Sequence, residues 1–224
     1  MRILDCRRKS QCTARGLIAL ALVAFTAQSM PGANPSKIGA IGKLGTTEFG
    51  KWLLDRNGNN AWDGTVTDGA YFWSTGDPAE IPVQGDWSGN GTTKMGVYIN
   101  GTWLLDYNGN GVWDAGDLTI VFGNSDYIPK VGDWNNLGST KLGLYKIYGT
   151  SQGTFLLDYN GSRILGGTPQ DRSVIWKSAT ANDAPVIGDW NGDGKAKIGI
   201  YTIDGTWIFR ADLRFQEIRV TSTV

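Results

Sequence analysis

The residues best suited to chemistry are oxygen-bearing side chains spaced two apart in a glycine-rich loop. Residues 106–117 read Asp-Tyr-Asn-Gly-Asn-Gly-Val-Trp-Asp-Ala-Gly-Asp. A calcium loop takes ligands from positions 1, 3, 5, 7, 9 and 12, where position 7 supplies its carbonyl, and needs Gly near position 6. These ligands would be Asp106, Asn108, Asn110, the Val112 carbonyl, Asp114 and Asp117. The spacing therefore predicts a structural calcium site.

A second loop repeats this pattern closer to the N-terminus. Its ligands would be Asp55, Asn57, Asn59, the Ala61 carbonyl and Asp63, whereas position 12 is Val66. The corresponding loops that begin at Asp158 and Arg210 have lost the acids. We therefore expect two calcium sites in this loop family.

Three other loops carry a lysine at the ninth position. In the loop 189–197, Asp189, Asn191, Asp193 and the Lys195 carbonyl fit a weaker calcium site, but Lys197 follows. The loop 86–94 ends on Lys94, and an ammonium group there could replace the ion. The loop 133–141 has no regular acidic spacing. Asn-Gly and Asp-Gly pairs also make ordinary hairpin turns because they tolerate positive φ. We favour that interpretation for these loops.

The loops belong to an internal repeat of short apolar strands. Val83–Tyr98, Val131–Tyr145 and Val186–Tyr201 share Gly-Asp-Trp, a loop, and a Lys-x-Gly-x-Tyr run. The repeat divides 37–224 into units at 37–80, 81–127, 128–184 and 185–224, each with four strands except the first, which lacks its opening strand. Strands such as Leu104-Leu105 are apolar at consecutive positions, as expected when both faces of a sheet are covered. These features predict an all-β, propeller-like array of about four blades.

The repeat resembles a known family. Gly-Asp-Trp-Asn-Gly-Asp-Gly at 188–194, followed by Lys-Ile-Gly-Ile-Tyr at 197–201, looks like the FG-GAP and VCBS-type repeats of bacterial secreted proteins. The resemblance covers Lys37–Val224. It implies a β-propeller related to that of integrin α-chains, with calcium in this loop.

The N-terminus has the pattern of a secretory signal at 1–29. Five basic residues accompany the apolar run Leu17–Ala27, which is too short for a spanning helix of about 20 residues. An uncleaved anchor is the weaker alternative, and a flexible segment at 30–36 would lead into the repeats. Cys6 and Cys12 both lie in this leader. We therefore expect a secreted or periplasmic protein without disulfides and without a membrane span. Bound calcium would then stabilise the fold in place of disulfides.

The charge and the amino-acid composition argue against some classes of partner and site. Removing five of 21 basic and one of 21 acidic residues leaves 16 against 20, a net charge of −4. This argues against nucleic acid as a partner. The chain has no His, which excludes His-based triads and His metal sites.

The tryptophans are expected to divide between core and surface. Trp87, Trp134 and Trp190, like Trp52, Trp103 and Trp207, recur at fixed repeat positions and should be buried. Trp62, Trp73, Trp113 and Trp176 are better candidates for exposure, where they could stack on sugars, although packing between blades is the use that we favour for them.

The function that these features favour is binding or adhesion, with a protein or glycan as ligand and without catalysis. The alternative is a polysaccharide hydrolase or lyase, which needs acids that converge in a cleft. Asp77, Glu80, Asp126 and Asp183 precede the first strands of repeats and could converge on one face. An array of fewer than four full blades also exposes a sheet edge, so a homodimer that completes the ring is a further expectation.

Overall fold

The computed structural model describes residues 39–44, 48–55, 59, 61–149, 151–165, 171–177, 180, 182–210 and 217–221. This part of the chain consists of β-strands, turns and loops, without a helix and hence without a helix that could span a membrane. The all-β prediction is confirmed. The predicted signal at 1–29 and the segment at 30–36 lie outside the described residues.

The strands form four antiparallel meanders in chain order. The first sheet has three strands, β1 (Gly39–Leu44), β2 (Glu48–Leu54) and β3 (Gly69–Phe72). The second contains β4 (Ile81–Gly85), β5 (Lys94–Ile99), β6 (Thr102–Leu105) and β7 (Leu118–Val121). The third contains β8 (Ile128–Gly132), β9 (Lys141–Tyr148), β10 (Gln152–Leu157) and β11 (Arg172–Lys177). The fourth contains β12 (Ala184–Gly188), β13 (Lys197–Tyr201), β14 (Thr206–Arg210) and β15 (Glu217–Thr221).

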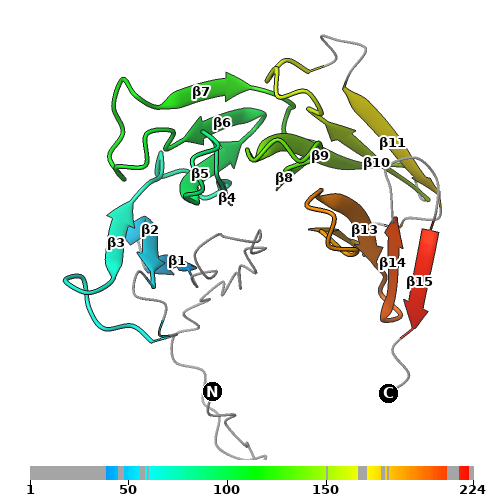
Figure 1. Ribbon diagram of the computed structural model, residues 1–224, viewed down its shortest axis with the longest axis horizontal. Helices are drawn as coiled ribbons and strands as arrows, with labels where there is room; N and C mark the ends of the chain where they lie inside the picture. Colours follow the sequence, from blue (N-terminus) through cyan, green and yellow to red (C-terminus); the bar gives the residue numbers. More distant parts are fainter. Residues whose placement is uncertain are drawn as a thin grey trace, which may run out of the picture.

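The four sheets follow one another along an open arc (Figure 1). The first and last sheets lie at its two ends, and β3, β7, β11 and β15 form its outer rim. On the inner side, β4 contacts β8, and β8 contacts β12. Each sheet therefore packs face to face on the next sheet in the chain.

Three apolar cores fill the spaces between consecutive sheets. In each core, one sheet presents an aromatic face to an aliphatic face of the next. Trp52 and Trp73 of the first sheet pack on Met95 and Val97. Between the second and third sheets, Trp87, Tyr98, Trp103 and Phe122 pack with Leu142 and Leu144. Between the third and fourth, Trp134, Tyr145, Phe155 and Trp176 pack with Ile198, Ile200 and Ile208.

Consecutive apolar residues in a strand serve two different cores, as the sequence predicts. Leu104 packs in the core with the first sheet, whereas Leu105 belongs to the core with the third. Because successive side chains of a strand point to opposite faces, such pairs are required wherever a sheet is covered on both sides.

A glycine at the end of β8 allows the third and fourth sheets to approach closely. A Cβ atom on Gly132 would lie 2.6 Å from the Cβ of Ala196 in the next sheet. Gly85 stands in the same relation to Thr140, at 2.5 Å from its Cγ2. These positions therefore bring neighbouring sheets and their loops together.

Candidate functional site

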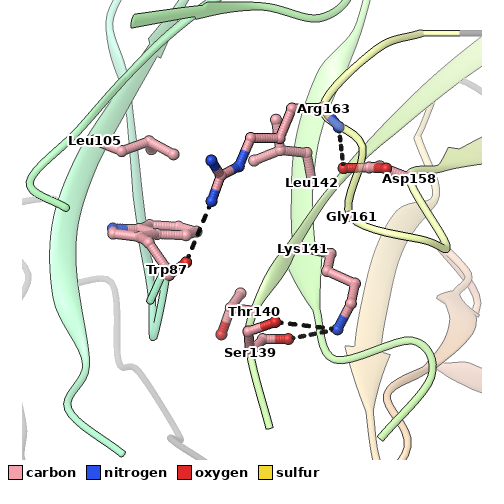
Figure 2. A pocket seen from close by; sticks show the side chains of 9 residues that line it. All are labelled: Trp87, Leu105, Ser139, Thr140, Lys141, Leu142, Asp158, Gly161 and Arg163. Carbon is pink, nitrogen blue, oxygen red and sulfur yellow. Dashed lines mark hydrogen bonds between the residues drawn. The ribbon is translucent and has the colours of Figure 1, made fainter. Parts of the chain in front are cut away.

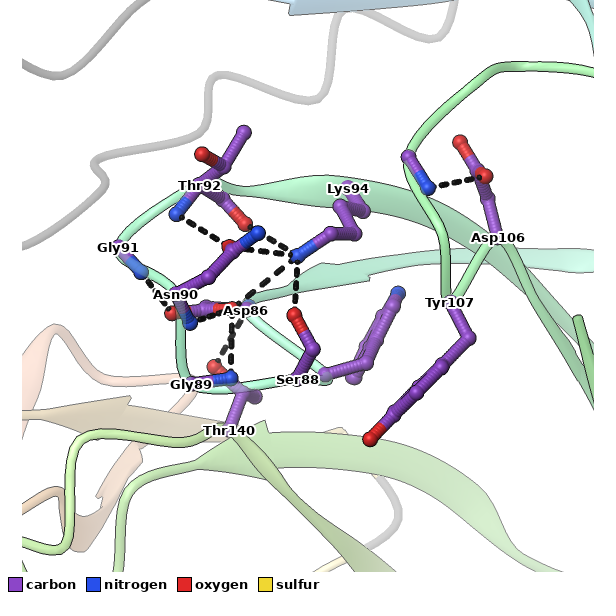
Figure 3. Close-up of polar contacts among 12 residues, drawn as sticks. Asp86, Ser88, Gly89, Asn90, Gly91, Thr92, Lys94, Asp106, Tyr107 and Thr140 are labelled. Atoms are coloured by element: carbon purple, nitrogen blue, oxygen red, sulfur yellow. Dashed lines mark hydrogen bonds and ion pairs between the residues drawn. The ribbon is translucent and has the colours of Figure 1, made fainter. Parts of the chain in front are cut away.

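The loop between β4 and β5 encloses the ammonium group of Lys94 (Figure 3). Its Nζ atom donates to Asp86 Oδ1 at 3.2 Å, Ser88 Oγ at 2.8 Å, Asn90 Oδ1 at 2.9 Å and the Thr92 carbonyl at 3.1 Å. These oxygens come from positions 1, 3, 5 and 7 of the loop, which are calcium-ligand positions. A buried lysine thus supplies the cation of this loop from the chain itself.

The backbone of this loop is organised by its first carboxylate. Asp86 Oδ1 accepts the N–H of Gly89, and Oδ2 accepts the N–H of Gly91. Gly89 and Gly91 have φ values of 72° and 82°, a region that favours glycine. The Asn-Gly turn chemistry therefore shapes the loop, and the ammonium group fills it.

In the other two lysine loops the ammonium group also contacts the first acid and the seventh-position carbonyl. Lys141 Nζ lies 2.8 Å from Asp133 Oδ1 and 2.9 Å from the Ser139 carbonyl. Lys197 Nζ lies 2.7 Å from Asp189 Oδ1, 2.6 Å from Asp193 Oδ1 and 2.9 Å from the Lys195 carbonyl. In the loop 189–197, the Lys197 ammonium group therefore contacts three of the four expected calcium ligands. The fourth, Asn191, donates to Asp193 instead.

The charges and N–H groups in the loop 189–197 lower the pKa values of two carboxyl groups. Burial opposes ionisation of Asp189, but hydrogen bonds from Lys197 and the Gly194 N–H outweigh it, and the pKa of Asp189 falls below its usual value. Lys197 lowers the pKa of Asp193 to about 2. Both acids are therefore ionised at neutral pH and paired with one ammonium group.

The loop 106–117 has the same first turn but no lysine. Asp106 is buried, and its two oxygens accept the N–H groups of Gly109 and Gly111, as Asp86 does in its own loop. The ninth residue is Asp114, whose oxygens accept the side-chain N–H groups of Asn108 at 3.0 Å and Asn110 at 2.7 Å. The predicted residues Asp106, Asn108, Asn110 and Asp114 are thus gathered in one loop.

Asp117 closes this loop rather than adding to its centre. One of its oxygens accepts the N–H of Tyr107 at 3.0 Å, and the other accepts the N–H of Asp114 at 2.9 Å. Burial raises the pKa of Asp106 above its usual value, although N–H groups lower it, and the charge of Asp117 raises it further. In contrast, the N–H of Gly116 and the Asn110 amide lower the pKa of Asp114.

The loop that begins at Asp55 shares this architecture, with one difference from the prediction. Asn59 donates to Asp63, as Asn110 does to Asp114. The N–H of Asp63 donates to Asp68 Oδ2 at 2.7 Å, so buried Asp68 does the work of Asp117. Val66, at the expected twelfth position, is exposed in the turn.

Sequence reasoning missed Asp68 because the turn before it is two residues longer. The available signal was a second acid after a Trp-Asp pair, which both loops have. The Ala61 N–H donates to Asn59 Oδ1 at 2.8 Å, and Asp55 is buried. The predicted ligand Asn57 lies outside the described residues.

The donor set of the loop 106–114 fits a calcium ion by its chemistry. It consists of hard oxygen donors at the spacing at which Lys94 is held in the loop 86–94, and an acid replaces that lysine. Lys94 is thus a stand-in cation for the family of loops. Among the described residues, no group of three or more acidic, His or Cys side chains is placed to hold a metal. A site here would depend on amide and carbonyl oxygens.

The corresponding loops of the third and fourth sheets each contain an arginine. Arg163 takes the position of Gly111, with a φ of 62°, and its guanidinium lies near the Trp87 carbonyl at 3.5 Å (Figure 2). Arg210 takes the position of Asp106, and lies over the Trp176 ring at 4.9 Å. The loop of the third sheet keeps its first acid, since Asp158 Oδ2 accepts the N–H of Arg163 at 3.0 Å.

A small pocket lies beside Arg163, between the second and third sheets (Figure 2). Its lining includes Trp87, Leu105, Lys141 and Asp158, and its volume is about 40 Å³. A bound water needs roughly 10–15 Å³. The pocket therefore has room for a few waters, not for a sugar ring.

The acids considered for a cleft are engaged in local contacts. Asp77 accepts the N–H of Ala79, and Glu80 accepts the Ser74 hydroxyl and the Thr75 N–H. Asp126 pairs with Lys146, and Asp183 accepts the N–H groups of Thr180 and Ile203. Each carboxylate thus stabilises a turn or an ion pair.

The predicted division of the tryptophans is partly wrong. Trp62 and Trp113, each next to a ninth-position acid, are 48% and 52% exposed, as expected. Trp73 and Trp176 are buried, because they end up on sheet faces that the next sheet covers. Conversely, Trp190 and Trp207 are only partly covered, because they lie on the outer face of the last sheet.

Comparison with protein-family models, curated proteins and solved structures finds no match for this chain.

Proposed function

We propose that this chain is a secreted, calcium-stabilised repeat module for binding or adhesion, of the FG-GAP/VCBS type and with a propeller-like arrangement of its sheets. The observation that carries the calcium proposal is the contrast between two loop families. Where position 9 is lysine, its ammonium group binds the loop oxygens, and where it is Asp114, the described side-chain contacts of this acid are with the amides of Asn108 and Asn110 and the N–H of Gly116.

Charge supports a divalent cation in the loop 106–114. Its two aspartates add two negative charges, and burial raises the pKa of one of them, Asp106. A calcium ion held by Asp106, Asp114, the Asn108 and Asn110 amide oxygens and the Val112 carbonyl would neutralise them. It would act structurally, by fixing the loop that links β6 to β7.

Binding is favoured over catalysis by what the described surface offers. The pocket at Arg163 is too small for an organic substrate, and the candidate acids are engaged in turns and an ion pair. Trp62 and Trp113 are exposed beside the two calcium-type loops, where aromatic rings can stack on a sugar or pack on a protein. We therefore propose a glycan or protein as ligand.

Thermal unfolding with calcium and with a chelator tests the metal. Calcium should raise the midpoint of the unmodified chain, and Asp106→Ala with Asp114→Ala should abolish most of that shift. Asp204→Ala is the control, because Asp204 is an acid in an exposed turn outside the calcium-type loops. Equal midpoints with calcium and chelator in the unmodified chain would refute the calcium site.

A glycan array separates ligand binding from catalysis. Binding that Trp113→Ala weakens, without turnover of the polysaccharide, would support the module. Release of reducing ends or unsaturated products would instead identify the alternative, a polysaccharide hydrolase or lyase.

A further inference from the structure

The last sheet carries an aromatic face that no described sheet covers. This outer aromatic face consists of Trp190, Tyr201, Trp207 and Phe209. Its rings contact one another, with centroids 4.4 Å apart for Trp190 and Phe209 and 4.7 Å apart for Tyr201 and Trp207. Trp190, Tyr201 and Trp207 are 36%, 38% and 37% exposed. A contiguous exposed aromatic cluster of this kind marks an interaction surface.

The same ring arrangement is buried in the two preceding sheets. Tyr98 and Trp103 have ring centroids 4.9 Å apart and pack on the third sheet. Tyr145 and Phe155 have centroids 4.6 Å apart and pack on the fourth. The outer aromatic face is therefore the third copy of a face whose partner, in both earlier cases, is the aliphatic face of another repeat.

The main chain beside this face also lacks its usual partner. At the two preceding junctions, the loop of the next sheet donates an N–H to the carbonyl of the first loop acid: Thr140 donates to Asp86, and Ala196 to Asp133, both at 2.8 Å. No N–H of the described residues donates to the equivalent carbonyl, that of Asp189. At this end of the arc, both a main-chain acceptor and an aromatic face are therefore available for contact with another sheet.

The complementary face lies at the other end of the arc. Leu53 alternates in β2 with Trp52 and Leu54, which face the second sheet, so Leu53 lies on the opposite face. It corresponds to Leu104, Leu156 and Ile208 in the later sheets, each of which packs in the core shared with the preceding sheet. No sheet precedes the first one among the described residues, and Leu53, whose side chain is partly buried, belongs to none of the three cores.

We propose that the outer aromatic face of one copy packs on the Leu53 face of the first sheet of a second copy. The contact extends the interface that the chain already makes three times, with an aromatic face on an aliphatic one. Two arcs related by a two-fold axis make the contact twice, so each copy covers both ends of the other. In Figure 1 the first and last sheets lie at the two ends of an open arc.

Mass and association by analytical ultracentrifugation test the contact. The unmodified chain should form a dimer that dissociates on dilution. Trp207→Glu should weaken it by at least about 30-fold, because the contact would bury an unpaired carboxylate. Tyr201→Arg provides a second variant of the same face. Ile203→Glu is the matched control, since Ile203 is exposed in the β13–β14 turn of the same sheet and lies outside the face.

A mixing experiment tests which surface the face binds. Leu53→Glu should also produce monomers, while a mixture of the Trp207→Glu and Leu53→Glu chains should form heterodimers through one intact junction. Circular dichroism and unfolding midpoints establish that each variant is folded. A monomeric unmodified chain would overturn the proposal. So would dimers that Trp207→Glu breaks and Leu53→Glu leaves intact, because that result means that two aromatic faces pair with each other.

Discussion

The Nζ atom of Lys94 lies 3.2 Å from Oδ1 of Asp86, and both side chains are largely shielded from solvent. The lysine follows the acid by eight residues, the separation between positions 1 and 9 of a calcium loop. The same pair recurs as Lys141 with Asp133 and Lys197 with Asp189. Three loops of the fold are therefore fixed by an internal cation.

Replacing the lysine of such a loop by a neutral residue should destabilise the fold. Lys94→Met leaves the Asp86 carboxylate, whose side chain is 14% exposed, without its counter-ion, which should lower the free energy of unfolding by about 3 kcal/mol. Lys146→Met is the control, because Lys146 pairs with Asp126 at 2.7 Å at an exposed site where water screens the charges, and its effect should be much smaller. Urea unfolding of both variants measures the difference. Equal losses would show that burial of the pair does not matter.

Replacing the lysine by an acid should change what the loop binds. Lys94→Asp gives the loop 86–94 the same residue classes as the loop 106–114, with oxygen donors at positions 1, 3, 5, 7 and 9. If the calcium proposal is right, this variant should be unstable in chelator and should regain stability on addition of calcium. Titration calorimetry should then count one more calcium ion than in the unmodified chain. An unchanged ion count would contradict the equivalence of the two loop families.

The sequence predicts the loops better than it predicts burial. The chemistry at Lys94, Asp106 and Asp114 follows from local spacing, since each loop is shaped by residues within about ten positions. Burial of Trp73 and exposure of Trp190 depend instead on whether another sheet stacks on that face, which no local pattern encodes. Asp68 was missed for a third reason, because two extra turn residues moved it out of the expected register.

Lowering the pH should reduce the stabilisation that the loop 189–197 gives to the fold, within a defined pH range. Lys197 lowers the pKa of Asp193 to about 2 from an unfolded value of about 3.9. Since the folded pKa is the lower one, the pair stabilises the fold fully above about pH 4, and the contribution is lost as the pH falls toward 2. Asp193 is 43% exposed, so screening limits the effect to below about 1 kcal/mol.

Unfolding measured between pH 6 and pH 2 checks this range. Asp193→Asn should remove part of the slope between pH 4 and pH 2. Asp77→Asn is the control, because Asp77 accepts a turn N–H and pairs with no lysine among the described residues. A slope that Asp193→Asn leaves unchanged would place the acid sensitivity at other carboxylates.

Loss of the hydroxyl group should affect stability differently at two tyrosines in equivalent repeat positions. The Tyr98 hydroxyl donates to the Asn124 carbonyl, whereas the buried Tyr145 hydroxyl has no hydrogen-bond partner among the described residues. Burial also raises the pKa of Tyr145 to about 12, so the group stays neutral. Tyr98→Phe should therefore cost about 1 kcal/mol of stability, while Tyr145→Phe should cost nothing or stabilise slightly. Because the two substitutions remove the same atom, urea unfolding compares them directly. A loss in Tyr145→Phe as large as that in Tyr98→Phe would mean that the buried hydroxyl has a partner in solution, such as a bound water.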